Sequence, residues 1–391
     1  MNNCFAYQNF DVPKSPLKDF SHIILTGKNG TGKTTILNRV AFQLNEFKNE
    51  RNKKEGVPYL LAVIDANKKH PNLGVWKQQL KEFADVDLMY LDGSDDNLLK
   101  KTDEYIFSFF KAHRRVELKD VSSVTKEDLF VGELQKQNDS DKFASEFKQY
   151  LVNKKVYEAF DFMNAKTEKI NLNQTFFSNL TKILKNIFGD ANLELEFIQE
   201  NFEFYIKLDG GRLITFNQLS EGFSAFISIL MDLLMRVDLL RKLKSDFTYN
   251  PNGIVLIDEP ETHFHIAMQY EILPLLTELF PNIQFIVATH SPAIISSIKN
   301  AVVFDLSSKS EVLGWQAGSS YSELMINHFG LANEFSPIAD KILFEVNDAV
   351  LNNDPTKLKR IINDNESYLT PSLRFEIENQ IIAIESKRDP I

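Results

Sequence analysis

The sequence predicts an α/β fold: a mixed sheet with a helical insertion and a helical C-terminal tail. An apolar run, His22 to Thr26, ends at a glycine-rich turn and is followed by apolar spacing that suits a helix from Thr34 to Phe47. Two later runs, Gly253 to Ile257 and Ile283 to Ala288, show no alternation, as expected for strands covered on both faces. Residues 119–189 contain almost no glycine or proline, which predicts the helical insertion.

The remaining elements are predicted from period and turn residues. Apolar or alternating runs predict further strands at Tyr59 to Asp65, Val86 to Leu91, Tyr105 to Phe110, Leu193 to Gln199, Phe202 to Leu208, Arg212 to Thr215 and Val302 to Leu306. We expect Leu193 to Gln199 and Phe202 to Leu208 to form a hairpin, and Val302 to Leu306 to be the last strand of the chain. Helical spacing predicts a long buried helix and a three-helix tail: Ser220 to Lys242, Pro337 to Leu351, Thr356 to Ile362 and Pro371 to Ser386.

Charge and cysteine content exclude several classes of function. The chain has 391 residues, with 54 acidic and 44 basic side chains and a net charge of -10, so a polyanion would be repelled except at a local basic patch. A single cysteine, Cys4, excludes an intramolecular disulfide and a cysteine zinc site. The first residues carry no secretion signal, and charged residues interrupt the most apolar segment, Phe223 to Leu240. We therefore expect a cytoplasmic protein without a membrane partner.

The strongest motif is Gly27 to Thr34, which matches the phosphate-binding loop GxxxxGK[ST] between a predicted strand and a predicted helix. Its glycines let backbone N–H groups face a phosphate at the helix N-terminus, and Lys33 adds positive charge. Thr34 offers a hydroxyl to Mg²⁺. The predicted ATP-binding residues of this loop are Asn29, Gly30, Thr31, Gly32, Lys33, Thr34 and Thr35.

A second motif lies far downstream, where the strand Gly253 to Ile257 is followed by Asp258 and Glu259. Ligands collect at the carboxyl ends of strands in open α/β sheets. We expect Asp258 to hold Mg²⁺ together with Thr34, and Glu259 to orient or deprotonate the water that attacks the γ-phosphate.

Two weaker signals complete an ordered set. Leu219-Ser220-Glu221-Gly222-Phe223 stands at the start of the long helix, and His290 follows the strand that ends at Ala288. In this order and wording the sequence resembles the ABC-type ATPases, specifically the branch that includes SMC and RecF proteins, the overcoming-lysogenization-defect ATPases, and the defence ATPases of Septu, PARIS and some retrons. Ile257 to His265 matches the IDEPExHLH wording of that branch.

This resemblance implies roles for further residues. Ser220 and Gly222 would contact the γ-phosphate of ATP held by the opposite subunit, His290 would act catalytically within its own subunit, and Thr262 to His265 would form the D-loop at the dimer seam. For the glutamine lid, Gln78, Gln79 and the segment Ala112 to Arg115 all compete, and the family wording favours the last. The aromatic residue that stacks on adenine stays open among three candidates: Phe5, Phe10 and Phe20.

The resemblance also suggests an organisation and a function. We divide the chain into a first half of the ATPase lobe (1–116), a helical insertion with a β-hairpin (117–215), a second half of the lobe (216–330) and a helical tail (331–391). ATP-dependent formation of a homodimer or larger homo-oligomer would control a separate nuclease or toxin in antiphage defence. The tail lacks the acidic pattern of a nuclease, so we expect the chain itself to cut nothing.

Two other functions compete with this one. The first is an SMC- or RecF-like ATPase for DNA repair or bridging, with four residues as candidates for a basic face: Arg114, Arg115, Lys154 and Lys155. The second is the nucleotide-binding subunit of a transporter, which the wording at Thr262 to His265 disfavours.

Overall fold

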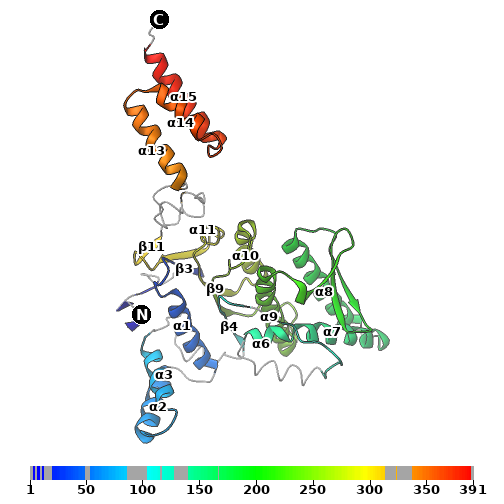
Figure 1. The fold of residues 1–391 in the computed structure, drawn as a ribbon. Coiled ribbons are helices and arrows are strands. Elements are labelled where there is room, and N and C mark those ends of the chain that lie inside the picture. Colours follow the sequence, from blue (N-terminus) through cyan, green and yellow to red (C-terminus); the bar gives the residue numbers. More distant parts are fainter. Residues whose placement is uncertain are drawn as a thin grey trace. The chain divides into compact units, whose positions relative to one another are not determined.

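The computed structural model describes most of the chain, namely residues 3–4, 7–8, 11–12, 20–48, 53–85, 104–114, 117–126, 140–165, 167–312, 323 and 337–388 (Figure 1). The chain divides into two compact units, Met1–Ser319 and Ser320–Ile391. A short antiparallel pair, β1 (Asn3–Cys4) and β2 (Tyr7–Gln8), begins the first unit. The second unit contains the tail helices.

The first unit is built on a mixed six-stranded sheet in the order β11-β10-β3-β9-β8-β4. All neighbouring strands are parallel except β10 and β11, which are antiparallel. The strand bounds are β3 (His22–Thr26), β4 (Ile106–Phe110), β8 (Gly253–Asp258), β9 (Ile283–Ala288), β10 (Ala301–Asp305) and β11 (Ser310–Val312). The predicted α/β class with a mixed sheet is confirmed, but β10 is not the last strand, because β11 pairs with it.

Helices connect and cover these strands. They are α1 (Lys33–Lys48) directly after β3, α9 (Glu221–Lys244) before β8, α10 (Ile266–Leu279) between β8 and β9, and the short α11 (Pro292–Ser296) after β9. One core cluster joins α1 to the sheet: Leu25, Ile36, Leu37, Val40, Ala41, Leu44, Phe107, Leu256, Ala288, Phe304 and Leu306. In β8 five of the six residues are buried, Val255 and Ile257 on one face and Leu256 on the other, so this central strand is covered on both faces, as predicted.

The predicted strand from Tyr59 to Asp65 is wrong, because this run lies in helix α2 (Lys53–Ala66), which packs against α3 (Leu73–Asp85). Burial in α2 follows helical spacing: Gly56 and Leu60 are buried, whereas Tyr59 and Leu61 are exposed. A short apolar run cannot distinguish a helix from a buried strand by its period alone. The predicted strand from Val86 to Leu91 lies outside the described residues.

The helical insertion is confirmed by α6 (Ser140–Ser145), α7 (Phe147–Met163) and α8 (Thr167–Phe188). The predicted hairpin follows as β5 (Glu194–Ile198) and β6 (Glu203–Lys207), with β7 (Leu213–Thr215) as a third antiparallel strand and a 3-10 turn, η2 (Phe216–Gln218), after it. Aromatic rings fill this part of the core, as in the stacked pair Phe177 and Phe204.

The second unit is the predicted tail of three helices, α13 (Pro337–Leu351), α14 (Pro355–Asp364) and α15 (Pro371–Arg388) (Figure 1). Its own core comprises Ile342, Val346, Ala349, Leu358, Ile361, Ile362, Leu373, Ile377, Ile381 and Ile384. In the described part of the chain, none of the helices combines the length and apolar character that crossing a membrane requires.

Candidate functional site

The candidate site lies at one edge of the central sheet, where the parallel strands β3, β8 and β9 end. The register pairs Leu25 with Ala288 and Asp258 with Ala288, so the three strands end at the same level. The glycine-rich loop follows β3, Asp258 and Glu259 lie at the end of β8, and His290 follows β9. Residues far apart in the sequence are thereby collected at the carboxyl edge, where ligands bind in such sheets.

The glycine-rich loop curls through positive φ angles that glycine accepts without strain: 129° at Gly27, 80° at Gly30 and 91° at Gly32. The ammonium of Lys33 is buried and donates to the carbonyl oxygens of Gly27 (2.9 Å) and Lys28 (3.3 Å). Burial lowers the pKa of Lys33. The nearby carboxylates, of which Glu259 has the largest effect, oppose this shift because their negative charge raises the pKa. This lysine therefore presents its charge inside the loop, next to the N-terminus of α1.

The outer part of the same loop rests on the turn after β10. The backbone N–H of Lys28 donates to the hydroxyl of Ser307 (2.7 Å), and the N–H of Ser307 donates to Asp305 (2.8 Å). A Cβ atom at Gly27 would lie 2.9 Å from the Ser307 hydroxyl. Glycine is needed at Gly27 both for its φ and for this close approach. The predicted loop residues Asn29 and Gly30 are exposed, and Thr31, Gly32 and Thr35 are half-buried.

Thr34 and Asp258 are brought together although 224 positions separate them: the Thr34 hydroxyl donates to Oδ2 of Asp258 over 2.8 Å. Asp258 is 2% exposed, and its other oxygen, Oδ1, is buried without a hydrogen-bond partner among the described residues. Burial is the main reason why the pKa of Asp258 is raised. A hydroxyl beside a carboxylate with a spare oxygen is the donor set that Mg²⁺ prefers, so these residues fit that ion.

Glu259 adopts the left-handed conformation, with φ of 46°, which is rare outside glycine. Its N–H donates to the carbonyl of Ala288 (2.8 Å), and its own carbonyl accepts from the N–H (3.2 Å) and hydroxyl (2.9 Å) of Thr262. The side chain is half-buried. The Glu259 carboxylate lies close enough to the glycine-rich loop for its charge to raise the pKa of Lys33.

Arg114 is the contact that the sequence did not predict. Four residues after β4, its guanidinium donates to the carbonyl oxygens of Lys111 (2.7 Å), Asp258 (2.8 Å) and Glu259 (3.2 Å). The sequence offered Arg114 only as part of a lid segment or of a DNA-binding face. With 6% exposure it is not available to a DNA-binding face, so that assignment is wrong, whereas the lid segment stays a prediction.

The other candidates for these two roles, and those for stacking on adenine, are placed as follows. Lys154 is also buried and pairs with Asp238 at 3.0 Å, so it too is wrongly assigned to a DNA-binding face, while Lys155 pairs with Glu158. Gln78 lies on α3 and donates to Glu82, and Gln79 lies on the same helix. Phe20 is exposed and packs edge-on against His22. Arg115, Phe5 and Phe10 lie outside the described residues.

His290 is held by Glu261, another residue to which the sequence gave no role. Oxygen Oε1 of Glu261 accepts from the hydroxyl of Thr289 (2.6 Å) and from the N–H groups of His290 (2.8 Å) and Ser291 (3.2 Å). Burial lowers the pKa of His290, and the charge of Lys33 lowers it further. The imidazole is therefore kept neutral, and it lies close enough to the glycine-rich loop for the charge of Lys33 to affect its pKa. The signal that could have identified Glu261 is the last acidic residue of the motif Asp258-Glu259-Pro260-Glu261.

The LSEGF stretch packs against the turn that follows β8. A Cβ atom at Gly222 would lie 2.6 Å from the carbonyl oxygen of His263, and the ring of Phe264 lies edge-on to Phe223 and Phe226. Ser220 occupies the N-cap position of α9, but its exposed side chain accepts no capping hydrogen bond. Among the described residues, neither Ser220 nor Gly222 is hydrogen-bonded to the glycine-rich loop. Within one chain, these two predicted residues are therefore not part of the assembled site.

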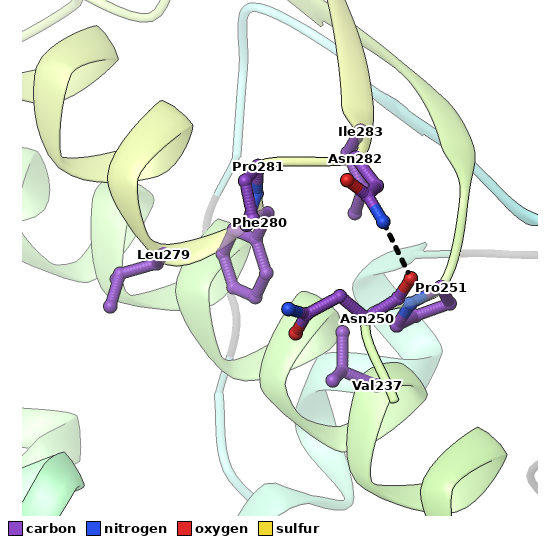
Figure 2. A pocket seen from close by; sticks show the side chains of 8 residues that line it. All are labelled: Val237, Asn250, Pro251, Leu279, Phe280, Pro281, Asn282 and Ile283. Atoms are coloured by element: carbon purple, nitrogen blue, oxygen red, sulfur yellow. Dashed lines mark hydrogen bonds between the residues drawn. The ribbon is translucent and has the colours of Figure 1, made fainter. Parts of the chain in front are cut away.

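A small hollow lies at the opposite edge of the sheet, where β8 and β9 begin (Figure 2). The amide of Asn282 closes it by donating to the carbonyl of Asn250 (2.9 Å). Its lining residues are Val237, Asn250, Pro251, Leu279, Phe280, Pro281, Asn282 and Ile283. This hollow contains no ionisable side chain and lies away from the carboxyl edge, so we do not consider it part of the site.

Comparison with known proteins agrees with this geometry. Residues 76–296 match a family model described as "AAA domain, putative AbiEii toxin, Type IV TA system". The retron Vc95 probable ATPase of Vibrio cholerae serotype O1 biovar El Tor is 30% identical over 49% of this chain, and the Septu protein PtuA of Bacillus mycoides is 25% identical over 69%. The aligned parts are 36% and 34% of those relatives, so the chain matches about a third of their length.

Among solved structures, the Smc head domain of Pyrococcus furiosus, bound to the C-terminal domain of ScpA, aligns with 76% of this chain and 91% of that one. The identity is 13% and the TM-score 0.37. The resemblance that the motifs predicted, to ABC-type ATPases of retron and Septu systems, is confirmed by the family match and by these relatives.

Proposed function

The chain belongs to the AAA-domain family that its residues 76–296 match, and we propose that it binds ATP with Mg²⁺ at the carboxyl edge of the sheet and hydrolyses it. The predicted enzyme class, an ATPase, is borne out by this family and by relatives named probable ATPases. The observation that carries the proposal is the contact between Thr34 and Asp258 next to the buried ammonium of Lys33. It unites a phosphate-binding loop with a metal-binding acid.

Binding and hydrolysis use different residues of this edge. The backbone N–H groups of the loop Asn29 to Thr35 and the charge of Lys33 would bind the phosphates, and Thr34 with Asp258 would hold Mg²⁺. When bound, the ion supplies positive charge that offsets the charge developing on the transferred phosphoryl group. The half-buried carboxylate of Glu259 would orient or deprotonate the attacking water, and the neutral imidazole of His290 would donate a hydrogen bond to the reacting phosphate.

We further propose that two copies share each ATP. This is supported by Ser220, whose exposed hydroxyl does not cap its own helix, and by the absence of any hydrogen bond from Ser220 to the loop within the described part of one chain. A second copy would supply Ser220 and Gly222 to the first copy's nucleotide. Charge-assisted hydrogen bonds contribute about 1.5 to 3 kcal/mol each. Two at each of two sites give about 6 to 12 kcal/mol, comparable with the roughly 4 to 15 kcal/mol that association costs.

Because these magnitudes nearly cancel, hydrolysis would decide whether the dimer stays closed. We propose that this ATP-dependent assembly, in the cytoplasm, controls a separate nuclease or toxin in antiphage defence. The supporting observation is that relatives of this chain are a retron probable ATPase and Septu proteins. The insertion (117–215) and tail (331–391) are the proposed docking regions beside the two halves of the ATPase lobe (1–116 and 216–330). An SMC-like role on DNA is disfavoured, because Arg114 and Lys154 are buried.

Mixing two inactive variants tests the shared site. Lys33→Ala removes the loop lysine but keeps a normal LSEGF stretch, whereas Ser220→Ala does the reverse. If sites act independently, random mixing makes half of the dimers mixed, each with one intact site of two, which restores about a quarter of the wild-type rate. A mixture no more active than its two components would refute the shared site. Calorimetry on Lys33→Ala alone, showing weakened ATP binding, tests the loop separately.

A further inference from the structure

Arg114 approaches the turn after β8 from the segment that follows β4. The side chain is 6% exposed, and its two terminal nitrogens reach the carbonyl oxygens of two successive peptides: Nη1 donates to Asp258 over 2.8 Å and Nη2 to Glu259 over 3.2 Å. A planar guanidinium fixes two acceptors in one plane, which an ammonium cannot do. The contact therefore specifies the orientation of the two peptides on either side of the Glu259 Cα atom.

This turn needs such a contact. Glu259 has a φ of 46°, a conformation that a residue with a Cβ atom keeps only when its surroundings hold it there. On one side, the N–H of Glu259 is bound to Ala288 in β9, and on the other its carbonyl accepts from Thr262. The Asp258 carbonyl belongs to the same peptide as the Glu259 N–H, and Arg114 binds it directly.

Arg114 is itself fixed before it reaches the turn. The same Nη1 that binds Asp258 also donates to the carbonyl of Lys111 over 2.7 Å, in the segment that directly follows β4. Strand β4 is parallel to β8 over five register pairs, ending with Phe110 opposite Ile257. The guanidinium therefore links the ends of the neighbouring strands β4 and β8. It fixes the main chain at Glu259 relative to the edge of the sheet.

We propose that Arg114 is a positioning residue for hydrolysis, which holds the main chain of Asp258 and Glu259 so that the Glu259 carboxylate faces the nucleotide. This inference rests on the proposed ATPase function. Arg114 does not touch the loop residues that would bind phosphate in any described hydrogen bond. Removing it should therefore impair turnover while nucleotide binding is maintained.

The test measures kcat and ATP affinity for the full chain and for Arg114→Lys, Arg114→Met and Arg114→Ala. Small displacements of catalytic groups cost up to about 100-fold in rate, so we expect kcat to fall roughly 10- to 100-fold. The dissociation constant for ATP should change less than about twofold, since the glycine-rich loop is intact. For Arg114→Ala, millimolar guanidinium should restore part of kcat by occupying the vacated site, whereas sodium chloride at the same ionic strength should not.

Arg236→Lys is the matched control. Arg236 is half-buried, with its side chain 11% exposed, and on α9 its guanidinium binds both oxygens of Asp232. Its replacement should lower thermal stability without changing kcat, which separates a general loss of stability from a loss of positioning. If wild type hydrolyses ATP but all three Arg114 variants keep kcat within twofold, Arg114 is not a positioning residue. If ATP affinity falls as much as kcat, or if guanidinium restores nothing, the inference is likewise overturned. A wild-type chain without ATPase activity would instead refute the proposed function.

Discussion

Replacing Gly222 by alanine tests whether the LSEGF stretch and the turn after β8 form one packed unit. The added Cβ atom would lie 2.6 Å from the carbonyl oxygen of His263, and ordinary contact begins near 3.4 Å, so one of the two backbones must move by about 0.8 Å, the difference of these distances. The obstacle is main chain rather than the end of a flexible side chain. His263 already has a φ of 66°, so its turn has little freedom to move.

Overpacking of this kind costs about 1 to 3 kcal/mol, and we expect the free energy of unfolding of the first unit to fall by that amount. Urea unfolding followed by tryptophan fluorescence measures it selectively, because both tryptophans, Trp76 and Trp315, fall within residues 1–319. Gly74→Ala on α3 is the matched control, since a Cβ atom there meets nothing within 4 Å. That substitution should instead stabilise the unit by about 0.4 to 1 kcal/mol.

The same Gly-to-Ala change should lower the free energy of unfolding at Gly222 and raise it at Gly74, and this difference in sign is the informative result. If Gly222→Ala is as stable as wild type while Gly74→Ala is stabilised as expected, the close approach to His263 does not exist and the packing argument fails. A destabilised Gly222→Ala that still forms an ATP-dependent dimer of normal affinity would keep the packing but refute the role of Gly222 at the second copy's nucleotide.

Two further predictions concern hydrolysis and pH. Glu259→Gln should bind ATP normally and accumulate a closed dimer, because only the group that activates water is changed; sedimentation with ATP showing no more association than wild type would contradict this. His22 is buried, and burial lowers its pKa from 6.5 to about 4. A folded pKa below the unfolded one means that the unfolded state takes up the proton first, so stability is constant above pH 6.5 and falls between pH 6.5 and 4, by up to about 3 kcal/mol. In His22→Asn, whose amide oxygen can replace Nδ1 as the acceptor for the Phe285 N–H, this part of the pH dependence should disappear; an unchanged profile would assign it to other groups.

Local patterns predicted the parts of the site that depend on local chemistry. The loop Gly27 to Thr34 and the acids after β8 each carry their own signal, a glycine spacing in one case and an apolar run ending in carboxylates in the other. Two parallel strands then bring them to the same edge, which is why Thr34 meets Asp258 as expected. The assignment of roles to these residues stays a prediction until the variants are measured.

Contacts between distant segments could not be predicted in this way. Arg114 reads as one of several basic residues in a loop, and its burial becomes visible only when β4 lies next to β8. The run Tyr59 to Asp65 has the composition of a strand, and the close approach of Gly56 to Phe83 of α3, together with the burial of Leu60, belongs to a helix. In both cases a tertiary neighbour, absent from the local sequence, determines the outcome.

Lys154 illustrates the same limit and has a consequence for the proposed dimer. It lies on α7 of the insertion and pairs with Asp238 of α9, which also accepts a hydrogen bond from Tyr150. Burial alone would raise the pKa of Asp238, but Lys154 and Lys242 beside it hold the pKa below its usual range, so the pair stays charged. Separating a buried pair leaves an uncompensated charge, which makes the joint between α7 and α9 costly to open.

Helix α9 is therefore held at two places, at its start by the turn that contains His263 and further along by the insertion. The exposed Ser220 sits at the N-terminus of this helix. Any partner that displaced the insertion would also shift α9, the helix that would present Ser220 to a second copy in the proposed dimer. Because a packed interior transmits a displacement rather than absorbing it, the insertion is the part of the chain through which an effector could most directly favour or oppose dimer closure.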